Sequence, residues 1–156
     1  MSIASPSEQA LTPLLEDRRR FGIYAHDLLA TVQHAGDVEE AIKRFAVSRQ
    51  LNDEETAELG ALARRVVEDP QTARFFSPEY RAKNECDLVA DGRRGRPDRV
   101  VLTPTETWVV DFKTGTPLNE HRNQVQAYCK ALSDMGYPQV SGYLLYIADE
   151  LNVVAC

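Results

Sequence analysis

The chain has 156 residues, 43% of them hydrophobic and 27% charged, a composition that excludes a disordered or fibrous protein and suits one folded domain. With 18 Lys and Arg against 24 Asp and Glu, its formal charge is -6, whereas a domain that binds nucleic acid unaided is usually basic. No apolar run approaches the roughly 20 residues of a membrane-spanning helix. The first residues also lack the basic and then apolar order of a signal peptide, so we expect a cytoplasmic protein that does not enter a membrane.

The first half of the chain is predicted to be helical. A tail or leading helix is expected over residues 1–20, with the helix itself at 8–19, ahead of a single domain at 21–156. Apolar residues from Phe21 to Val32 recur at helical spacing and predict an amphipathic helix that ends at Ala35-Gly36. Capping-box patterns start two further helices, at 37–49 and 52–68. Pro70 then lies just inside a short helix that reaches Phe76.

The second half of the chain is predicted to form a sheet. Strand-like runs at 80–90, 96–103 and 107–113 are separated by turn signals. A helix that starts at Asn119 and ends at Gly136 follows, and strands at 140–148 and 151–155 finish the chain. A meander of three strands, a helix and a return strand predict an α/β fold in which strands 107–113 and 140–148 are parallel.

The segment Asp111-Phe112-Lys113, at the end of an apolar strand, carries the clearest chemical signal. Side chains alternate along a strand, so Asp111 and Lys113 share one face while Trp108, Val110 and Phe112 point into a core. Asp98, thirteen residues upstream, would be brought alongside by the neighbouring strand. Two carboxylates that hold a divalent cation, together with an ammonium that stabilises developing charge, are the groups that phosphodiester hydrolysis requires.

Other polar residues fall at spacings that point toward the same place. Glu85 lies on the polar face of the expected strand 80–90. Gln124 and Tyr128 are four residues apart and project from one face of their helix. In the second predicted helix, Gly22 lies one turn before His26, and a glycine inside a helix indicates close approach by another part of the molecule.

Taken in order, these motifs resemble the RecB-like branch of the PD-(D/E)XK nuclease superfamily. The likeness is greatest to the C-terminal nuclease domain of AddA- and RecB-type helicase-nucleases, whose motor is a UvrD-like helicase. The resemblance implies a restriction-endonuclease-like core, with a central mixed sheet flanked by helices and a helical N-terminal region. It implies a metal-dependent deoxyribonuclease, an exonuclease rather than an endonuclease, that works with a helicase motor in double-strand break repair and recombination. A stand-alone nuclease of phage or restriction type, and an inactive nuclease fold that serves as a DNA-binding or scaffolding module, are the alternatives.

The same resemblance assigns roles to individual residues. The metal ligands would be His26, Asp98, Asp111 and the backbone carbonyl of Phe112. The residues in or lining the catalytic site would be Asp98, Asp111, Lys113, Glu85, Gln124 and Tyr128. This donor set suits Mg²⁺, with Mn²⁺ as a possibility because of the one imidazole.

Arginines near Asp98 offer a route for DNA despite the acidic net charge. Phosphate contacts are expected from Arg93, Arg94, Arg96 and Arg99, together with Gln124 and Tyr128. A solvated hairpin edge blunted by arginines is the alternative interpretation. The run Arg18-Arg19-Arg20 is interpreted as a solvated helix turn, with DNA contact as the alternative.

The three cysteines, Cys86, Cys129 and Cys156, contain no Cys-x-x-Cys pair. Cys86 and Cys129 fall on apolar faces and are interpreted as small core residues. Because an iron-sulfur cluster needs four cysteine ligands, we expect none here. His121 is interpreted as a surface residue.

Overall fold

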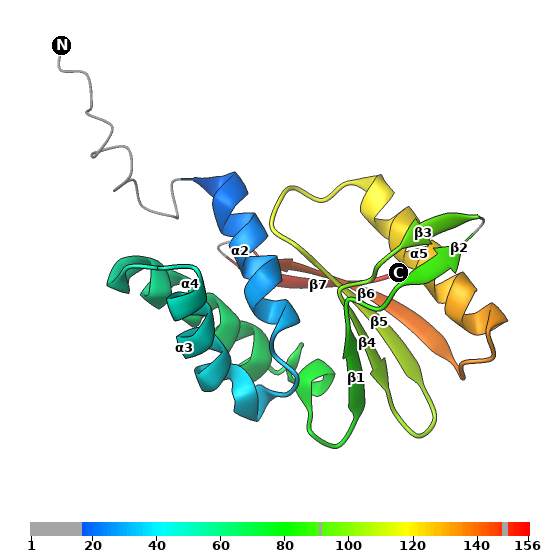
Figure 1. Ribbon diagram of the computed structural model, residues 1–156. Coiled ribbons are helices and arrows are strands. Elements are labelled where there is room, and N and C mark those ends of the chain that lie inside the picture. Colours follow the sequence, from blue (N-terminus) through cyan, green and yellow to red (C-terminus); the bar gives the residue numbers. More distant parts are fainter. Residues whose placement is uncertain (1–16, 91, 148–149) are drawn as a thin grey trace, which may run out of the picture.

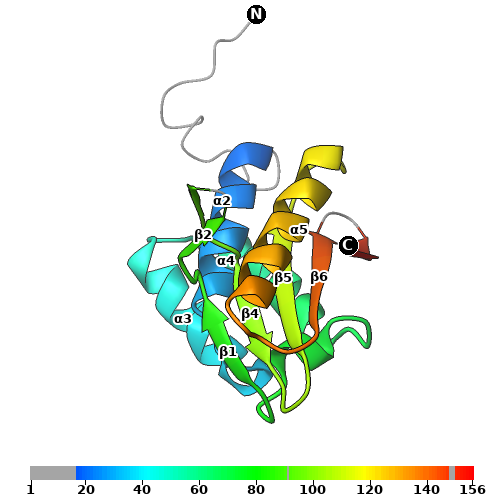
Figure 2. The same ribbon diagram turned by 90° about the vertical axis from the view of Figure 1, so that its right-hand side faces the viewer.

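The computed structural model describes residues 17–90, 92–147 and 150–156, and the predicted leading helix at 8–19 lies mostly outside them. A five-stranded sheet runs through the molecule in the order β1–β4–β5–β6–β7 (Figure 1). Its strands are β1 (Arg81–Asn84), β4 (Arg99–Leu102), β5 (Thr107–Lys113), β6 (Val140–Ile147) and β7 (Leu151–Ala155). Helices lie on both faces of this sheet, as Figure 2 shows. The predicted α/β fold with a central sheet flanked by helices is therefore confirmed.

Three helices pack on one face of the sheet and one packs on the other. The first group is α2 (Arg18–Ala30), α3 (Val38–Ser48) and α4 (Asp53–Glu68), and the opposite face carries α5 (Asn119–Asp134). The predicted capping box of α4 is confirmed, since the Asn52 side chain accepts from the Glu55 amide at 2.8 Å and the Glu55 carboxylate accepts from the Asn52 amide at 3.0 Å. None of the described helices has the length and apolar character needed to cross a membrane.

Two helix predictions need correction. The helix expected to reach Ala35-Gly36 ends at Ala30, and residues Ala35–Asp37 form a separate 3-10 turn. There the Asp37 carboxylate accepts from the His34 amide at 3.0 Å, so it caps this turn and not α3. The short helix expected at 70–76 is also a 3-10 turn, at Ala73–Phe76.

The sheet is mixed, as predicted. β4 pairs with β1 and β5 in antiparallel fashion, β5 and β6 are parallel, and β7 is antiparallel to β6. The parallel pair is joined by α5, which ends before Gly136 in a left-handed conformation (φ 95°). The amides of Gly136 and Tyr137 then donate to carbonyls of the last helical turn, and this satisfies the helix terminus.

The prediction of one strand over 80–90 was wrong, while the strand expected at 96–103 is present as the shorter β4. β1 stops at Asn84, and Glu85 adopts a left-handed backbone (φ 51°) that turns the chain out of the sheet. The excursion forms the small hairpin β2 (Leu88–Ala90) and β3 (Arg93–Gly95), whose buried Leu88 packs with residues of α5. The chain rejoins the sheet beside its point of departure, because the Glu85 amide donates to the Asp98 carbonyl at 3.0 Å.

β5 is buried on both faces and separates two cores. Trp108, Val110 and Phe112 pack with the first helix group, as predicted, while Val109 packs with α5. Asp111 alternates with Val110 and Phe112, so its carboxylate lies on the α5 side of the sheet. Only 3% of Asp111 is exposed.

Candidate active site

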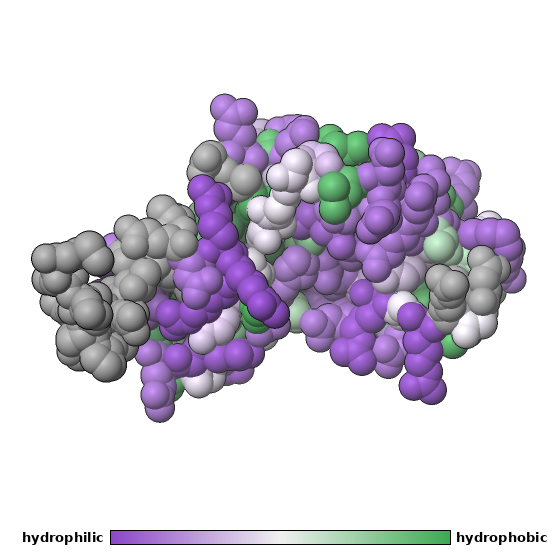
Figure 3. Space-filling view, turned by 90° about the horizontal axis from the view of Figure 1, so that it is seen from above, coloured by the Kyte–Doolittle hydropathy of each residue, from purple (hydrophilic) through white to green (hydrophobic). Residues whose placement is uncertain are grey.

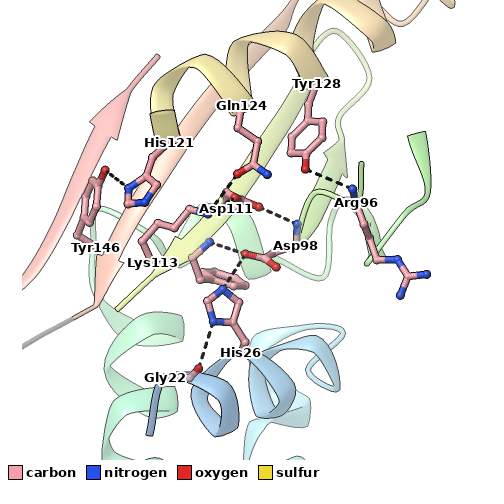
Figure 4. Close-up of polar contacts among 11 residues, drawn as sticks. Gly22, His26, Arg96, Asp98, Asp111, Lys113, His121, Gln124, Tyr128 and Tyr146 are labelled. Atoms are coloured by element: carbon pink, nitrogen blue, oxygen red, sulfur yellow. Dashed lines mark hydrogen bonds and ion pairs between the residues drawn. The ribbon is translucent and has the colours of Figure 1, made fainter. Parts of the chain in front are cut away.

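Three segments far apart in sequence meet at the carboxyl end of β5. The pairing of Arg99 with Val110 places Asp98, just before β4, opposite Asp111. The Asp98 amide donates to Asp111 Oδ1 at 3.0 Å, and Asp98 Oδ2 accepts from the Phe112 amide at 2.7 Å. From α2, His26 Nε2 lies 3.3 Å from Asp98 Oδ2 (Figure 4). The structure thus brings all four residues predicted as metal ligands into one cluster.

The orientation of His26 follows from its place on α2. Its Nδ1 lies 3.2 Å from the Gly22 carbonyl, one turn earlier in the helix. A proton held on Nδ1 by that carbonyl leaves Nε2, which faces Asp98, as the free nitrogen of the neutral ring. The hydrogen bond to Asp98, opposed by burial, raises the pKa of His26 to about 9. In the metal-free protein at neutral pH the His26 imidazole is therefore a cation. A metal ion that binds Nε2 would have to displace its proton.

Asp111 is a buried carboxylate beside a second one. Burial, followed by the charge of Asp98, raises the pKa of Asp111 to about 6, while the Lys113 ammonium acts in the opposite direction. Lys113 Nζ lies 3.2 Å from Asp111 Oδ2 and donates to Gln124 Oε1, also at 3.2 Å. Asp111 and Lys113 therefore share one face of β5, and Gln124 reaches them from α5 (Figure 4).

Tyr128 lies one turn beyond Gln124 on α5 and borders the cluster on the hairpin side. Its hydroxyl accepts from the Arg96 amide at 3.3 Å, and its ring packs against Gly95, which has no space for a side chain. Burial raises the pKa of Tyr128, so the phenol keeps its proton and can donate it in a hydrogen bond.

Glu85 takes a different place from the other predicted site residues. Its carboxylate is exposed and lies 3.9 Å from Arg96, whose guanidinium also pairs with Asp87 at 2.9 Å. Figure 4 shows the Arg96 side chain pointing away from the aspartates. Glu85 meets the cluster through its backbone, because its amide holds the Asp98 carbonyl.

Of the four arginines predicted to contact phosphate, Arg99 cannot do so, and the prediction for this residue was wrong. Its side chain is fully buried, stacks on the Phe76 ring at 4.3 Å and donates to the carbonyls of Phe75, Val32 and Gln33. Burial lowers the pKa of Arg99 to about 10. The alternation that puts Asp98 on the site face puts Arg99 into the opposite core. Arg94 and Arg96 are exposed, and the side chain of Arg93 lies outside the described part.

The donor chemistry of the cluster fits a hard divalent cation. It offers two carboxylates, one imidazole nitrogen and the Phe112 backbone, and a bound cation would relieve the repulsion between Asp98 and Asp111. Within residues 17–90, 92–147 and 150–156, no three His, Cys, Asp or Glu side chains converge in the arrangement of metal ligands. Asp98 Oδ2 is turned toward the Phe112 amide and His26, while Asp111 Oδ2 is turned toward Lys113.

Sequence analysis missed several neighbours of this cluster. Tyr146 is the partner of Lys113 in the parallel β5–β6 register, and its hydroxyl lies 3.0 Å from Nδ1 of His121. Burial and the nearby Lys113 charge lower the pKa of His121. The sequence predicts a surface position for this residue, and the structure places it, partly buried, next to Tyr146. Thr114 lies against Gly22, where an added Cβ would be 2.6 Å from Thr114 Oγ1. The glycine was noticed in the sequence, but its neighbour depends on tertiary packing.

Comparison with known proteins identifies the family. The sequence profile of the PD-(D/E)XK nuclease superfamily matches residues 5–153, and the chain belongs to this superfamily, whose members are in general metal-dependent nucleases with a restriction-endonuclease-like fold. No curated protein matches the sequence. A solved structure, the crystal structure of SSO0001, is similar at 22% identity with a TM-score of 0.38, over 83% of this chain and 65% of that chain. The chain thus spans somewhat less than two thirds of that relative.

Proposed function

We propose that this chain hydrolyses phosphodiester bonds of DNA with Mg²⁺ or Mn²⁺ bound at His26, Asp98, Asp111 and the Phe112 carbonyl. The observation that carries the proposal is the chain of short contacts from His26 through Asp98 and Asp111 to Lys113, with separations of 3.0 to 3.3 Å. When bound, the cation would polarise a phosphoryl oxygen and supply a water of lowered pKa.

Lys113 is the proposed catalytic cation. Asp111 and Gln124 contact its ammonium from two sides and fix its position. A fixed positive charge next to a buried, partly dehydrated site stabilises the negative charge that develops on the phosphate. Tyr128 can donate its hydroxyl proton to a phosphate oxygen from the hairpin side.

Substrate contacts are proposed for the rim of the cluster. Gln124 and Tyr128 border it on the side of α5. The exposed Arg94 and Arg96 lie in and just after β3 of the neighbouring hairpin, and Arg93 belongs to the same strand. Seen from above, this face is largely hydrophilic (Figure 3). These contacts reach phosphates and carry no base-specific information.

A helicase motor as a partner is a further part of the proposal. The formal charge of -6 repels DNA at a distance, so the chain needs another polypeptide, in the same or a partner chain, to deliver the strand. Delivery by a motor would make the enzyme an exonuclease of cytoplasmic double-strand break repair. A stand-alone nuclease is the alternative, and its mark would be efficient cleavage without any partner.

The test is cleavage of end-labelled single-stranded and duplex DNA at low salt, with Mg²⁺, Mn²⁺ or EDTA. Wild type should cleave only with metal, and Lys113→Ala should lose most cleavage, by about 10²-fold or more, while Mn²⁺ affinity in calorimetry stays unchanged. Lys43→Ala, which removes an exposed lysine of α3, is the matched control. Metal-independent cleavage, or cleavage by Lys113→Ala at the wild-type rate, would contradict the proposal.

A further inference from the structure

A groove adjoins the catalytic cluster on the α2 side. It measures about 410 Å³ and is formed by the first three turns of α2 together with Thr114, which follows β5. His26 belongs to both places, because it lines this groove and contacts Asp98. A strand whose phosphate lies at the catalytic cluster therefore meets this groove with a neighbouring nucleotide.

The groove carries positive charge that no carboxylate of the described residues pairs with. Arg18 and Arg19 line it and are exposed, and within residues 17–90, 92–147 and 150–156 neither forms an ion pair with a carboxylate. The neighbouring Arg20 pairs with Glu55 at 3.1 Å, and Asp27, the one acidic residue among the described residues of the lining, is paired with Arg49 at 3.0 Å. Two guanidinium groups without a carboxylate partner in the described part of the chain, beside the proposed phosphodiester site, are suited to bidentate contacts with phosphate oxygens.

The groove also presents an apolar surface. Ile23 lines it with 51% of its area exposed, whereas Leu28 and Leu29 of the same helix are buried. Bases of a duplex are stacked and paired, so an aliphatic side chain beside the backbone gains little from them. In a single strand the bases and sugars are open to such contact.

We propose that Arg18, Arg19, Ile23 and Thr114 form a subsite for single-stranded DNA, in which the arginines hold a phosphate next to the scissile one and Ile23 packs against the attached sugar or base. This inference rests on the proposed nuclease function and deepens it, because it commits the substrate to a single strand that crosses α2. The Thr114 hydroxyl, held against Gly22, can donate to the same phosphate.

Binding of a fluorescent oligothymidylate to the full chain in EDTA, followed by anisotropy over a series of salt concentrations, tests the subsite without cleavage. Arg18→Ala/Arg19→Ala should weaken binding at low salt and flatten the log-log salt slope by about 0.7, the value of the one single-strand phosphate contact that the two arginines share. Arg44→Ala, which removes an exposed arginine from α3, should leave the slope unchanged. An unchanged slope in the double variant overturns the subsite.

Ile23→Ser separates the apolar contact from the electrostatic one. Binding of the single strand should weaken roughly threefold to tenfold with the same salt slope, while binding of a hairpin duplex stays the same. An equal loss on the duplex, or no loss on the single strand, overturns the choice of substrate. If wild type cleaves DNA but these variants bind normally, the nuclease proposal stands and the subsite falls. If wild type never cleaves DNA but its binding depends on Arg18 and Arg19, the subsite stands and the nuclease proposal falls.

Discussion

Asp111 is held where a carboxylate is costly to keep. It is 3% exposed and next to Asp98, and its folded-state pKa of about 6 lies above the ordinary value of 3.8. The ionised form therefore destabilises the metal-free fold. The free energy of unfolding falls as pH rises from about 4 through 6, because the folded protein then has to lose a proton that it holds more tightly than the unfolded chain does. Such a residue is retained for its chemistry and not for its packing.

Asp111→Asn should stabilise the metal-free protein. The amide keeps a similar shape and an acceptor for the Asp98 amide, but removes the buried charge, so we expect unfolding in EDTA to cost on the order of 1–3 kcal/mol more at pH 7.5. Urea denaturation measures this. Asp134→Asn, which changes an exposed carboxylate of α5, should have almost no effect. A less stable Asp111→Asn protein would contradict the electrostatic reasoning.

His26 predicts how metal-free stability depends on pH. Its pKa is raised from the ordinary 6.5 to about 9 in the folded state. The contribution of the imidazolium is thus fully present below pH 6.5 and is lost as pH rises through 9. Urea unfolding in EDTA should show wild type becoming less stable between pH 6.5 and 9, while His26→Gln changes much less. Parallel pH profiles for the two proteins would show that His26 is not the titrating group.

At the scale of elements, the position of His26 depends on how closely α2 approaches the end of β5. Gly22→Ala should improve the intrinsic helix propensity of α2 by about 1 kcal/mol, yet it places a Cβ 2.6 Å from Thr114 Oγ1. We expect the clash to displace α2, separate His26 from Asp98 and lower both metal affinity and cleavage.

The double variant Gly22→Ala/Thr114→Ala removes the clashing oxygen and should recover metal affinity, as measured by calorimetry. Gly36→Ala is the matched control, because nothing lies within 4 Å of its added Cβ. A Gly22→Ala protein with wild-type metal affinity would show that the two elements can adjust without disturbing the site.

The elements that sequence predicted best are those in which local pattern and tertiary structure agree. β5 and α4 were predicted within one or two residues, because alternation in one and the capping box in the other have local causes. Strand 80–90 was not, since the left-handed backbone at Glu85 and the packing of Leu88 on α5 are set by distant contacts. Likewise, the expected pairing of neighbouring strands placed Asp98 beside Asp111, but it could not show that Arg99 is enclosed by backbone carbonyls of other segments.

For the whole molecule, the proposed metal ligands connect α2 to the sheet, so metal binding and global stability are linked. With free Mn²⁺ at about 100 times its dissociation constant, the folded state should gain about 2.7 kcal/mol. Differential scanning calorimetry of wild type should show a rise in Tm with Mn²⁺, and Asp98→Ala should show none. A similar rise in both proteins would place the metal elsewhere.

The burial of Arg99 has a practical consequence for protein engineering. A programme to reduce unwanted DNA binding would naturally remove the arginines between residues 93 and 99, which look equivalent in the sequence. Changes at Arg94 and Arg96 would test the proposed phosphate contacts. A change at Arg99 removes the guanidinium that donates to the carbonyls of Phe75 and Gln33 and to the Asn84 side-chain oxygen, so we expect the variant protein to misfold and accumulate in inclusion bodies.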